Sequence, residues 1–375
     1  MNQTRQIRVL FQCSSLDPKY GGPSVSEASL CRALKEITDL QVLCPKEKID
    51  TAFASSYGLN DVRPYTTRDV ALALVRPQHW LSRSLKNADV LHQNAHWRLS
   101  TTLLSCLASQ NRTPFILQPR GILSYGHRRV WIKKAFHWAL GKKALSHAAA
   151  IIALSRFEAT TISAFCQESR KLHVIPNGIT FPTHREEKSP YGEKIPWVYL
   201  GRIEPRKNIV FLIEAFAKYR ARGGKAPLVL VGPVEAGYDK VVREMITKHE
   251  LSSEVSWLAP QYEAAKWPYL QHAKAVIYPA LREAFGRVPF EAVAAGTVPI
   301  LPKDSGAYEY LGELLPMAIY QTTEVESLVK VMLAMEMKTP SVAVAQTWLA
   351  QHLSWEKIAS EFLSLYQTVG RPSAG

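Results

Sequence analysis

The sequence has few cysteines, no long apolar run and no metal-binding pattern, and each absence excludes a class of protein. Its five cysteines are odd in number and include no Cys-x-x-Cys pair, which is typical of a reducing compartment and of a chain without a metal site. No stretch approaches the roughly 18 to 20 consecutive apolar residues that span a bilayer. Residues 1–13, MNQTRQIRVLFQC, contain only a strand-length apolar run. We therefore expect a first strand there, no signal peptide and a cytoplasmic location.

Acidic residues are missing from a long central stretch, since none occurs between Asp89 and Glu158. Residues 1–185 carry 25 Lys and Arg against 11 Asp and Glu, whereas residues 186–375 carry 21 of each. The whole net charge of +14 therefore lies in the first half. No nucleic-acid-binding motif accompanies this charge, so we expect no nucleic-acid partner.

Residues 127–143, HRRVWIKKAFHWALGKK, interleave basic side chains with Trp131, Phe136 and Trp138 at helical spacing. This composition is typical of a helix that lies on an anionic membrane surface, and it favours peripheral association with the inner face of the plasma membrane. The alternative is an ordinary domain helix that buries these three aromatic rings in its own core. The sequence leaves both interpretations open.

Strand-like apolar runs alternate with helical stretches along the whole chain, which is the rhythm of parallel α/β sheets. We expect a first Rossmann-like domain at residues 1–180, a polar, proline-containing linker at 181–196 and a second Rossmann-like domain at 197–354. Ligands of such sheets bind beyond the carboxyl ends of the strands. The predicted fold class is therefore α/β, with two Rossmann-like domains facing across a cleft.

Residues 279–296, PALREAFGRVPFEAVAAG, place two carboxylates around a strand-to-helix junction. Glu283 falls in the loop and Glu291 in the helix, while the backbone from Phe285 to Arg287 offers free amides at the positive end of the helix dipole. A carboxylate such as Glu291 can accept both hydroxyls of a ribose. The alternative is that Glu291 forms a surface ion pair with Arg287, one turn earlier.

A second strand, turn and helix, WVYLGRIEPRKNIVFLIEAFAKY at residues 197–219, favours the binding interpretation. Its loop carries Arg202 and Lys207 five residues apart, and two cations beside a helix start can hold a diphosphate. The two segments together predict a site for a sugar nucleotide.

With these motifs the chain resembles the retaining glycosyltransferases of family 4, which have the GT-B fold. The resemblance rests on Gly201-Arg202 with Lys207, on Pro176-Asn177-Gly178-Ile179, and on the Glu-x7-Glu pattern from Glu283 to Glu291. It implies a nucleotide diphosphate sugar as co-substrate, no metal or other cofactor, and a C-terminal helix at 355–375 that crosses back to the first domain. The implied donor-binding residues are Gly21, Gly22, Asn177, Arg202, Lys207, Phe285, Gly286, Arg287 and Glu291.

The same resemblance implies that catalysis is mainly electrostatic stabilisation of the leaving diphosphate by Arg202 and Lys207. Glu283 would position the donor sugar. A nucleophile role for Glu283 like that in retaining glycosidases is disfavoured, because the sequence shows no second acidic residue at a spacing that would pair with it.

Two segments of the first half resemble the family's acceptor side. Asp89 to Trp97 is similar to the family's D-x-x-H-x-H-G-x-W pattern, with Asn94 in place of the second histidine. Pro119-Arg120-Gly121 resembles a segment found in the branch of the family that builds bacterial surface polysaccharides. The implied acceptor-binding residues are His92, Asn94 and Arg120. Ser155 to Glu158 fits the family pattern too, but we favour a helix cap there.

We therefore expect a metal-independent hexosyltransferase that acts on a glycan acceptor, lipid-linked in this interpretation, in bacterial cell-surface polysaccharide synthesis. One alternative is a non-catalytic scaffold or basic nucleic-acid-binding protein with the same fold. Another is a GT-B epimerase or phosphorylase, which would need no glycan acceptor.

Overall fold

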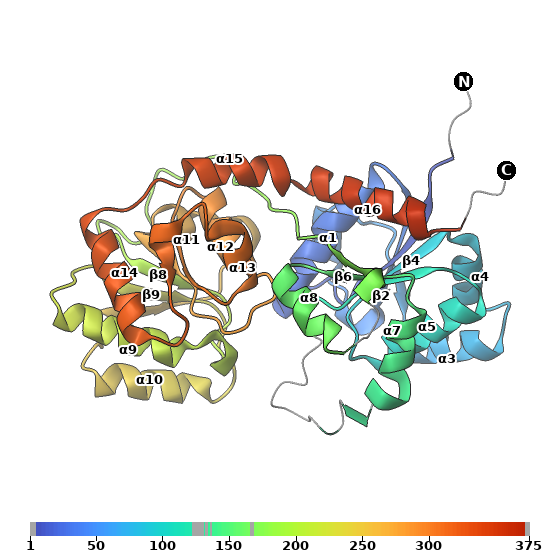
Figure 1. The fold of residues 1–375 in the computed structure, drawn as a ribbon, viewed down its shortest axis with the longest axis horizontal. Helices are drawn as coiled ribbons and strands as arrows, with labels where there is room; N and C mark the ends of the chain where they lie inside the picture. The colour runs from blue at the N-terminus through green and yellow to red at the C-terminus, as the bar shows by residue number, and fades with distance from the viewer. Residues whose placement is uncertain (1–4, 122–130, 132–133, 136, 166–168, 372–375) are drawn as a thin grey trace. The chain divides into compact units, whose positions relative to one another are not determined.

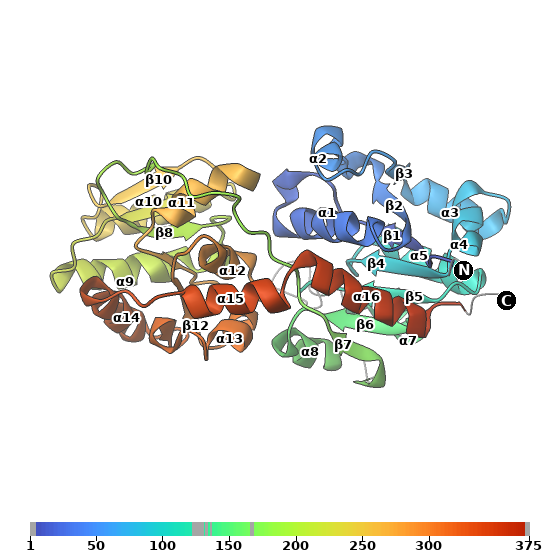
Figure 2. The ribbon, with the colours of Figure 1, turned by 90° about the horizontal axis from the view of Figure 1, so that it is seen from above.

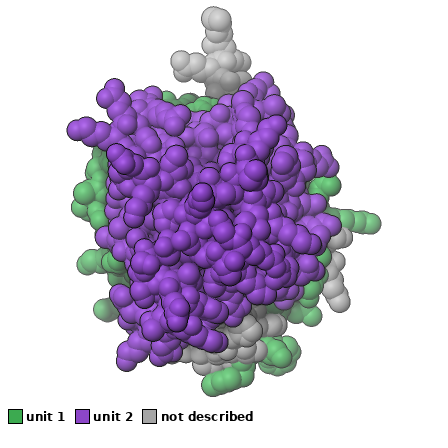
Figure 3. All heavy atoms as spheres, turned by 90° about the vertical axis from the view of Figure 1, so that its left-hand side faces the viewer, with its two compact units in different colours: residues 1–178, 353–375 green, residues 179–352 purple. Residues whose placement is uncertain are grey.

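The computed structural model describes residues 5–121, 131, 134–135, 137–165 and 169–371. The chain divides into two compact units, one formed by residues 1–178 with 353–375 and the other by residues 179–352 (Figure 3). Each unit contains one parallel sheet with helices around it (Figures 1 and 2). The predicted α/β class with two Rossmann-like sheets is confirmed.

The sheet of the first unit has seven strands in the order β3-β2-β1-β4-β5-β6-β7. The strands are β1 (Arg8–Gln12), β2 (Asp39–Pro45), β3 (Arg63–Tyr65), β4 (Val90–Asn94), β5 (Phe115–Gln118), β6 (Ala150–Ala153) and β7 (Leu172–Val174). The strands β4, β5 and β6 are buried along their whole length, as parallel strands covered on both faces usually are. The sequence did not indicate β3, a three-residue edge strand that contains a proline.

Helices surround this sheet on both faces (Figure 2). They are α1 (Gly22–Lys35), α2 (Thr51–Ser56), α3 (Thr67–Val75), α4 (Trp80–Asn87), α5 (Leu99–Gln110), α7 (Lys142–His147), α8 (Arg156–Ser163) and α16 (Trp355–Val369). A π-helical turn, His137–Gly141, precedes α7. The helix cap that we favoured is confirmed at α8, where Ser155 Oγ accepts a hydrogen bond from the Glu158 amide at 3.1 Å.

The sheet of the second unit has six strands in the order β10-β9-β8-β11-β12-β13. They are β8 (Trp197–Leu200), β9 (Leu228–Val231), β10 (Val255–Leu258), β11 (Ala275–Ile277), β12 (Pro299–Pro302) and β13 (Ile319–Tyr320). The helices are α9 (Ile209–Ala221), α10 (Tyr238–Lys248), α11 (Trp267–Gln271), α12 (Arg287–Ala294), α13 (Gly306–Leu311), α14 (Val325–Met337) and α15 (Ala343–His352). The strand β13 has only two residues, which is too short for a strand periodicity to show in the sequence.

The last helix, α16, lies beside α1 in the first unit (Figures 1 and 2). Its Tyr366 hydroxyl lies 2.6 Å from Nδ1 of His92 in β4, and the ring of Trp355 covers Gly178 so closely that a β-carbon there would come within 2.4 Å of it. The segment expected as a linker is hydrogen-bonded to the second unit, through Tyr191 Oη to the Tyr269 carbonyl at 2.8 Å. The domain limits expected from the sequence stay predictions.

Within the described part of the chain, no helix is long and apolar enough to cross a membrane.

Candidate functional site

The loops after β8 and β11 meet at the carboxyl edge of the second sheet, because these two strands are neighbours in it. The Leu281 amide donates to the Arg206 carbonyl at 3.3 Å, which ties the two loops together. On this frame Lys207 Nζ contacts the Glu283 carboxylate. Burial by itself raises the pKa of Glu283, but the charge and hydrogen bond of Lys207 outweigh it, so that the pKa lies below its usual range. The Glu283 carboxylate is therefore ionised at neutral pH.

The backbone around Glu283 is held by two close approaches. Gly306 at the start of α13 lies so near this loop that a β-carbon would fall 1.8 Å from the Ala284 carbonyl oxygen, and its amide donates to the Glu283 carbonyl at 2.9 Å. Gly286, with φ 72°, is the N-cap of α12, and a β-carbon there would lie 2.8 Å from Tyr278 Oη. Only glycine fits at either position.

Phe285 is buried, with its ring stacked on Phe290 at 4.3 Å between centroids. Its side chain belongs to the core, so only its backbone can serve a ligand.

Glu291 is buried in α12 and forms a double ion pair. Its Oε1 lies 2.8 Å from Lys266 Nζ and 2.9 Å from Arg287 Nη2, while its Oε2 makes no hydrogen bond within the described residues. Burial by itself raises the pKa of Glu291, but the two cations outweigh it and hold the pKa below its usual range. The contact with Arg287 that we weighed as an alternative is present, but it is buried instead of being a surface pair. One oxygen is left for a ligand.

Arg202 follows β8, and its guanidinium is more than half exposed, with Nη2 3.6 Å from Glu204 Oε1. Because this contact is long and the guanidinium lies largely in solvent, we expect it to add little stability and to leave the guanidinium available to an anion.

Gly21 and Gly22 mark the start of α1 in the first unit. Gly21 has φ 82°, and a β-carbon on it would meet no described atom within 4 Å. Gly22 is exposed as the first residue of the helix. The predicted turn is therefore an open, positive helix end.

Arg120, just beyond β5, binds several of the predicted residues together. Its Nε donates to Asn94 Oδ1 at 2.6 Å, and its Nη1 donates to Asn177 Oδ1 at 3.0 Å and to Ser26 Oγ at 3.1 Å. Its Nε also lies 3.4 Å from Oε1 of Glu27, a fully buried glutamate in α1. Four separate segments of the first unit are thus joined by one side chain.

Both ends of the Asn94 amide are occupied, because its Nδ2 donates to the Gln12 carbonyl at 2.8 Å while Arg120 takes its oxygen. His92 is fully buried between Tyr366 and Gln118, whose Oε1 lies 3.2 Å from His92 Nε2. Burial and the charge of Arg120 lower the pKa of His92 well below its usual value. Any effect of His92 or Asn94 on a ligand must pass through these neighbours.

Sequence reasoning missed Lys266, Gly306 and Glu27, and it assigned Glu158 only to a helix cap. The Glu158 carboxylate accepts hydrogen bonds from the amides of Leu154, at 2.7 Å, and of Gly121. For Glu27 a signal exists: it stands three, four and seven residues before Leu30, Cys31 and Leu34, on the buried face of α1, where an unpaired glutamate would be costly.

Among the described residues, no group of three or more His, Cys, Asp and Glu side chains could hold a metal ion. Independence from metal stays a prediction.

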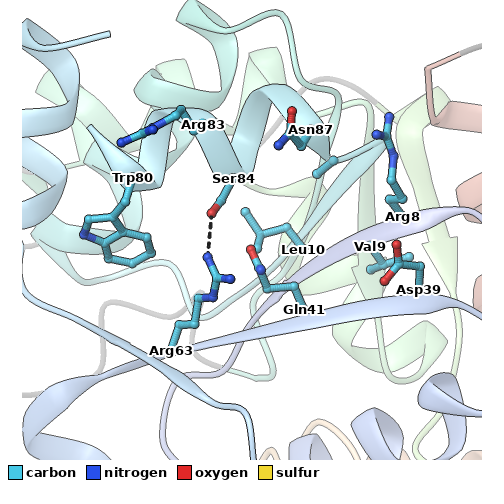
Figure 4. Close-up of a pocket in the computed structure, with 11 residues that line it drawn as sticks. Arg8, Val9, Leu10, Asp39, Gln41, Arg63, Trp80, Arg83, Ser84 and Asn87 are labelled. Carbon is cyan, nitrogen blue, oxygen red and sulfur yellow. Dashed lines mark hydrogen bonds between the residues drawn. The ribbon is translucent and has the colours of Figure 1, made fainter. Parts of the chain in front are cut away.

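A cavity of about 320 Å³ opens elsewhere in the first unit, lined among others by Arg8, Asp39, Arg63, Trp80 and Ser84 (Figure 4). Arg63 Nη1 donates to Ser84 Oγ at 3.5 Å across it. Because Arg8, Asp39 and Arg63 begin their strands, the cavity lies at the amino edge of the sheet. It is therefore separate from the predicted residues at the carboxyl edge.

Two family models match the chain. One, described as "Glycosyl transferases group 1", matches residues 180–342, and the other, described as "Glycosyltransferase Family 4", matches residues 20–181. Together they cover nearly all of both sheets.

Curated relatives match part of the chain. The D-inositol 3-phosphate glycosyltransferase of Jonesia denitrificans is 24% identical over 255 residues, which are 60% of this chain and 58% of that protein. The lipopolysaccharide 1,2-N-acetylglucosaminetransferase of Salmonella typhimurium is 25% identical over 237 residues, 57% of this chain and 61% of that protein. The chain thus spans about three fifths of the length of these relatives.

Among solved structures, HepE of Anabaena in complex with UDP and glucose superposes with a TM-score of 0.77, over 96% of this chain and 100% of that chain, at 19% identity. HepE in complex with UDP-glucose gives a TM-score of 0.74 at 19% identity, over 96% of this chain and 99% of that chain. At this identity the likeness shows the fold.

The ion pairs of Glu291 predict a pH-dependent stability. Since its pKa is lowered on folding, the stabilisation is fully present above the unfolded value of 4.5 and is lost as the pH falls through the folded value. At pH 7 Glu291→Gln should cost on the order of 3 kcal/mol, because Lys266 and Arg287 lose their buried partner. Urea unfolding at pH values from 7 to 3 should show that the difference in unfolding free energy between Glu291→Gln and wild type shrinks below pH 4.5. Exposed Glu356→Gln is the control, and a difference independent of pH would contradict the pairing.

Proposed function

Because the chain belongs to the glycosyltransferases of group 1 and family 4, we propose that it is a retaining, metal-independent hexosyltransferase. It takes its sugar from a nucleotide diphosphate sugar and transfers it to a glycan acceptor. The observation that carries the donor half of this proposal is the grouping of Lys207, Glu283 and the Gly286 helix start at one sheet edge.

In this proposal the reaction is a single displacement on the face of the sugar that the diphosphate leaves. The acceptor oxygen forms a bond to the anomeric carbon while the bond from that carbon to the diphosphate breaks, and the acceptor's proton passes to the leaving diphosphate. Lys207 and Arg202 stabilise the charge that develops on that diphosphate. The Glu283 carboxylate is already paired with the Lys207 ammonium. In this proposal Glu283 therefore orients the lysine and the donor sugar and does not attack the sugar.

The donor nucleotide rests against α12 in this proposal. The uncommitted Oε2 of Glu291 accepts a ribose hydroxyl, and its Oε1 stays with Lys266 and Arg287. The amides from Phe285 to Arg287 face the phosphates. The relative HepE was solved with UDP-glucose, so UDP-glucose is the first donor to test.

The acceptor is a lipid-linked glycan of bacterial surface polysaccharide synthesis in our proposal. Support comes from Pro119-Arg120-Gly121 and from the lipopolysaccharide transferase among the relatives.

A membrane contact through the basic segment is part of the proposal. Trp131 is 74% exposed and Trp138 is 84% exposed, beside the exposed Lys142 and Lys143. The alternative in which these two tryptophans are buried in the core is therefore wrong; Phe136 lies outside the described residues. Exposed tryptophans next to lysines are typical of a membrane-surface helix. We propose peripheral attachment to the inner face of the plasma membrane.

Glu291→Ala should weaken UDP binding about tenfold or more, because the ribose loses a charged acceptor. Isothermal titration of UDP, with and without EDTA and well below the melting temperature, measures it. Glu326→Ala, an exposed ion-pair residue of the same unit, should bind as wild type does. Equal affinities of Glu291→Ala and wild type would remove Glu291 from the donor site.

Arg202→Ala should lower turnover of UDP-glucose by roughly 100-fold, as loss of a transition-state contact does, with a smaller effect on stability because its guanidinium is more than half exposed. Lys207→Ala should lower turnover by a similar factor and should also lower stability, because it leaves Glu283 without its partner. UDP release, with and without a lipid-linked glycan extract, provides the rate. An Arg202→Ala variant that unfolds on preparation, or that keeps wild-type turnover, would mean that Arg202 is not a cation of the donor site.

Lys142→Ala/Lys143→Ala should weaken partition into anionic phosphatidylserine vesicles by about 2 kcal/mol, at about 1 kcal/mol for each lysine near the surface. Trp131→Ala/Trp138→Ala should weaken it further, since the apolar anchor is removed. Sedimentation with vesicles measures both. The matched control, Lys240→Ala/Lys248→Ala on exposed positions of α10, should bind as wild type does; an equal loss there would indicate unspecific charge attraction.

A further inference from the structure

Arg120 adopts a backbone conformation that costs free energy. Its φ is 56°, in the left-handed region, and the next strand end carries Ala95 with φ 68°. Such values persist in residues with side chains only where the surroundings impose them, and they cluster at functional sites. Two sets of contacts impose this conformation on Arg120. The next amide in the chain, that of Gly121, donates a hydrogen bond to the Glu158 carboxylate, and the guanidinium of Arg120 donates to Asn94 and Asn177.

The charge of Arg120 is compensated in the interior. Glu27 is fully buried, and its carboxylate accepts hydrogen bonds from the Ser14 amide at 2.6 Å and the Ser14 hydroxyl at 2.7 Å, besides facing Arg120. Burial raises the pKa of Glu27, and the guanidinium and the Ser14 bonds offset only part of that rise. Because Arg120 brings little net charge to the sheet edge, it is better suited to orienting neutral groups than to binding a phosphate.

The group that Arg120 orients is Asn177, which is 6% exposed. A guanidinium can only donate, so the amide oxygen of Asn177 must face Nη1 at 3.0 Å. The amide nitrogen Nδ2 then points the other way. It makes no hydrogen bond within the described residues, and it is not sealed in the interior. Asn94, by contrast, has both amide ends occupied.

We propose that Glu27 and Arg120 are positioning residues that fix the Asn177 amide so that its N–H donates to an oxygen of the bound sugar substrate. The proposal rests on the proposed transferase function and deepens it. It assigns to Glu27 a role that no sequence motif indicated. It also replaces a direct ligand contact of Arg120 by an indirect one.

Three variants test the chain of contacts. Asn177→Asp keeps the oxygen that faces Arg120 but loses the N–H donor. Arg120→Lys replaces the two separate nitrogens that bond Asn94 and Asn177 by a single ammonium group, and Glu27→Gln removes the buried charge. Turnover is measured as UDP release from UDP-glucose, and UDP affinity by calorimetry. We expect turnover to fall about tenfold or more in each variant, because a preorganised donor is lost, with UDP affinity within twofold of wild type.

The double variant Glu27→Gln/Asn177→Asp separates positioning from general damage. If Glu27 acts through Asn177, the double variant should lose no more turnover than the worse single variant, whereas independent effects would multiply. The control is Asp69→Asn, which weakens the hydrogen bond from the Thr66 amide to another carboxylate of this unit, 2.8 Å long at the start of α3. It should lower the melting temperature and leave turnover unchanged.

The outcomes distinguish this inference from the proposed function. Wild-type turnover of UDP-glucose that persists in Glu27→Gln or Asn177→Asp overturns the inference alone. A wild type that neither binds UDP nor consumes UDP-glucose overturns the function with this donor, and the inference is then decided by the side-chain amide resonance of Asn177. A resonance that is sharp and slow to exchange in wild type but averaged in Glu27→Gln supports positioning, and one unchanged by Glu27→Gln overturns it.

Discussion

Parallel strands that lie side by side end at the same edge of their sheet, and the candidate residues depend on this constraint. Lys207 and Glu283 are far apart in the sequence and meet because β8 pairs with β11. In the first unit, β1, β4 and β5 are consecutive neighbours, so Gln12, Asn94 and Arg120 form one hydrogen-bonded row. The order of the strands thus decides which of these side chains can meet.

Both units contain the same electrostatic arrangement, in which a buried or half-buried carboxylate holds a cation in place. Glu283 holds Lys207, Glu291 holds Lys266 and Arg287, and Glu27 holds Arg120. A buried ion pair contributes little net stability, because desolvation consumes most of the attraction, but loss of one partner is costly. What these pairs supply is fixed direction. A transferase that works by stabilising a leaving group needs charges that are already oriented before the substrate arrives.

Sequence patterns predicted those parts of the fold that repeat and those residues that have a local signature. The buried strands, the glycine at 286 and the Glu283–Glu291 spacing could all be read from short windows. Lys266 could not, since it reaches Glu291 from a turn 25 residues earlier. Nor could the short strands β3 and β13, whose three and two residues show no periodicity. The hydrogen bond from the Asn94 side chain to the Gln12 carbonyl joins residues more than 80 positions apart, and no spacing rule predicts such a contact.

The close approach of Gly306 to the Ala284 carbonyl limits how the sugar preference of such a protein can be redesigned. Substitutions at 283 to 286 change side chains on a backbone whose path is set by a helix start outside that segment. A library that randomises Gly306 together with this loop would consist mostly of misfolded members, since any β-carbon displaces the loop. Substitutions are better introduced at positions whose side chains are already exposed, such as Arg282, with Gly286 and Gly306 left unchanged.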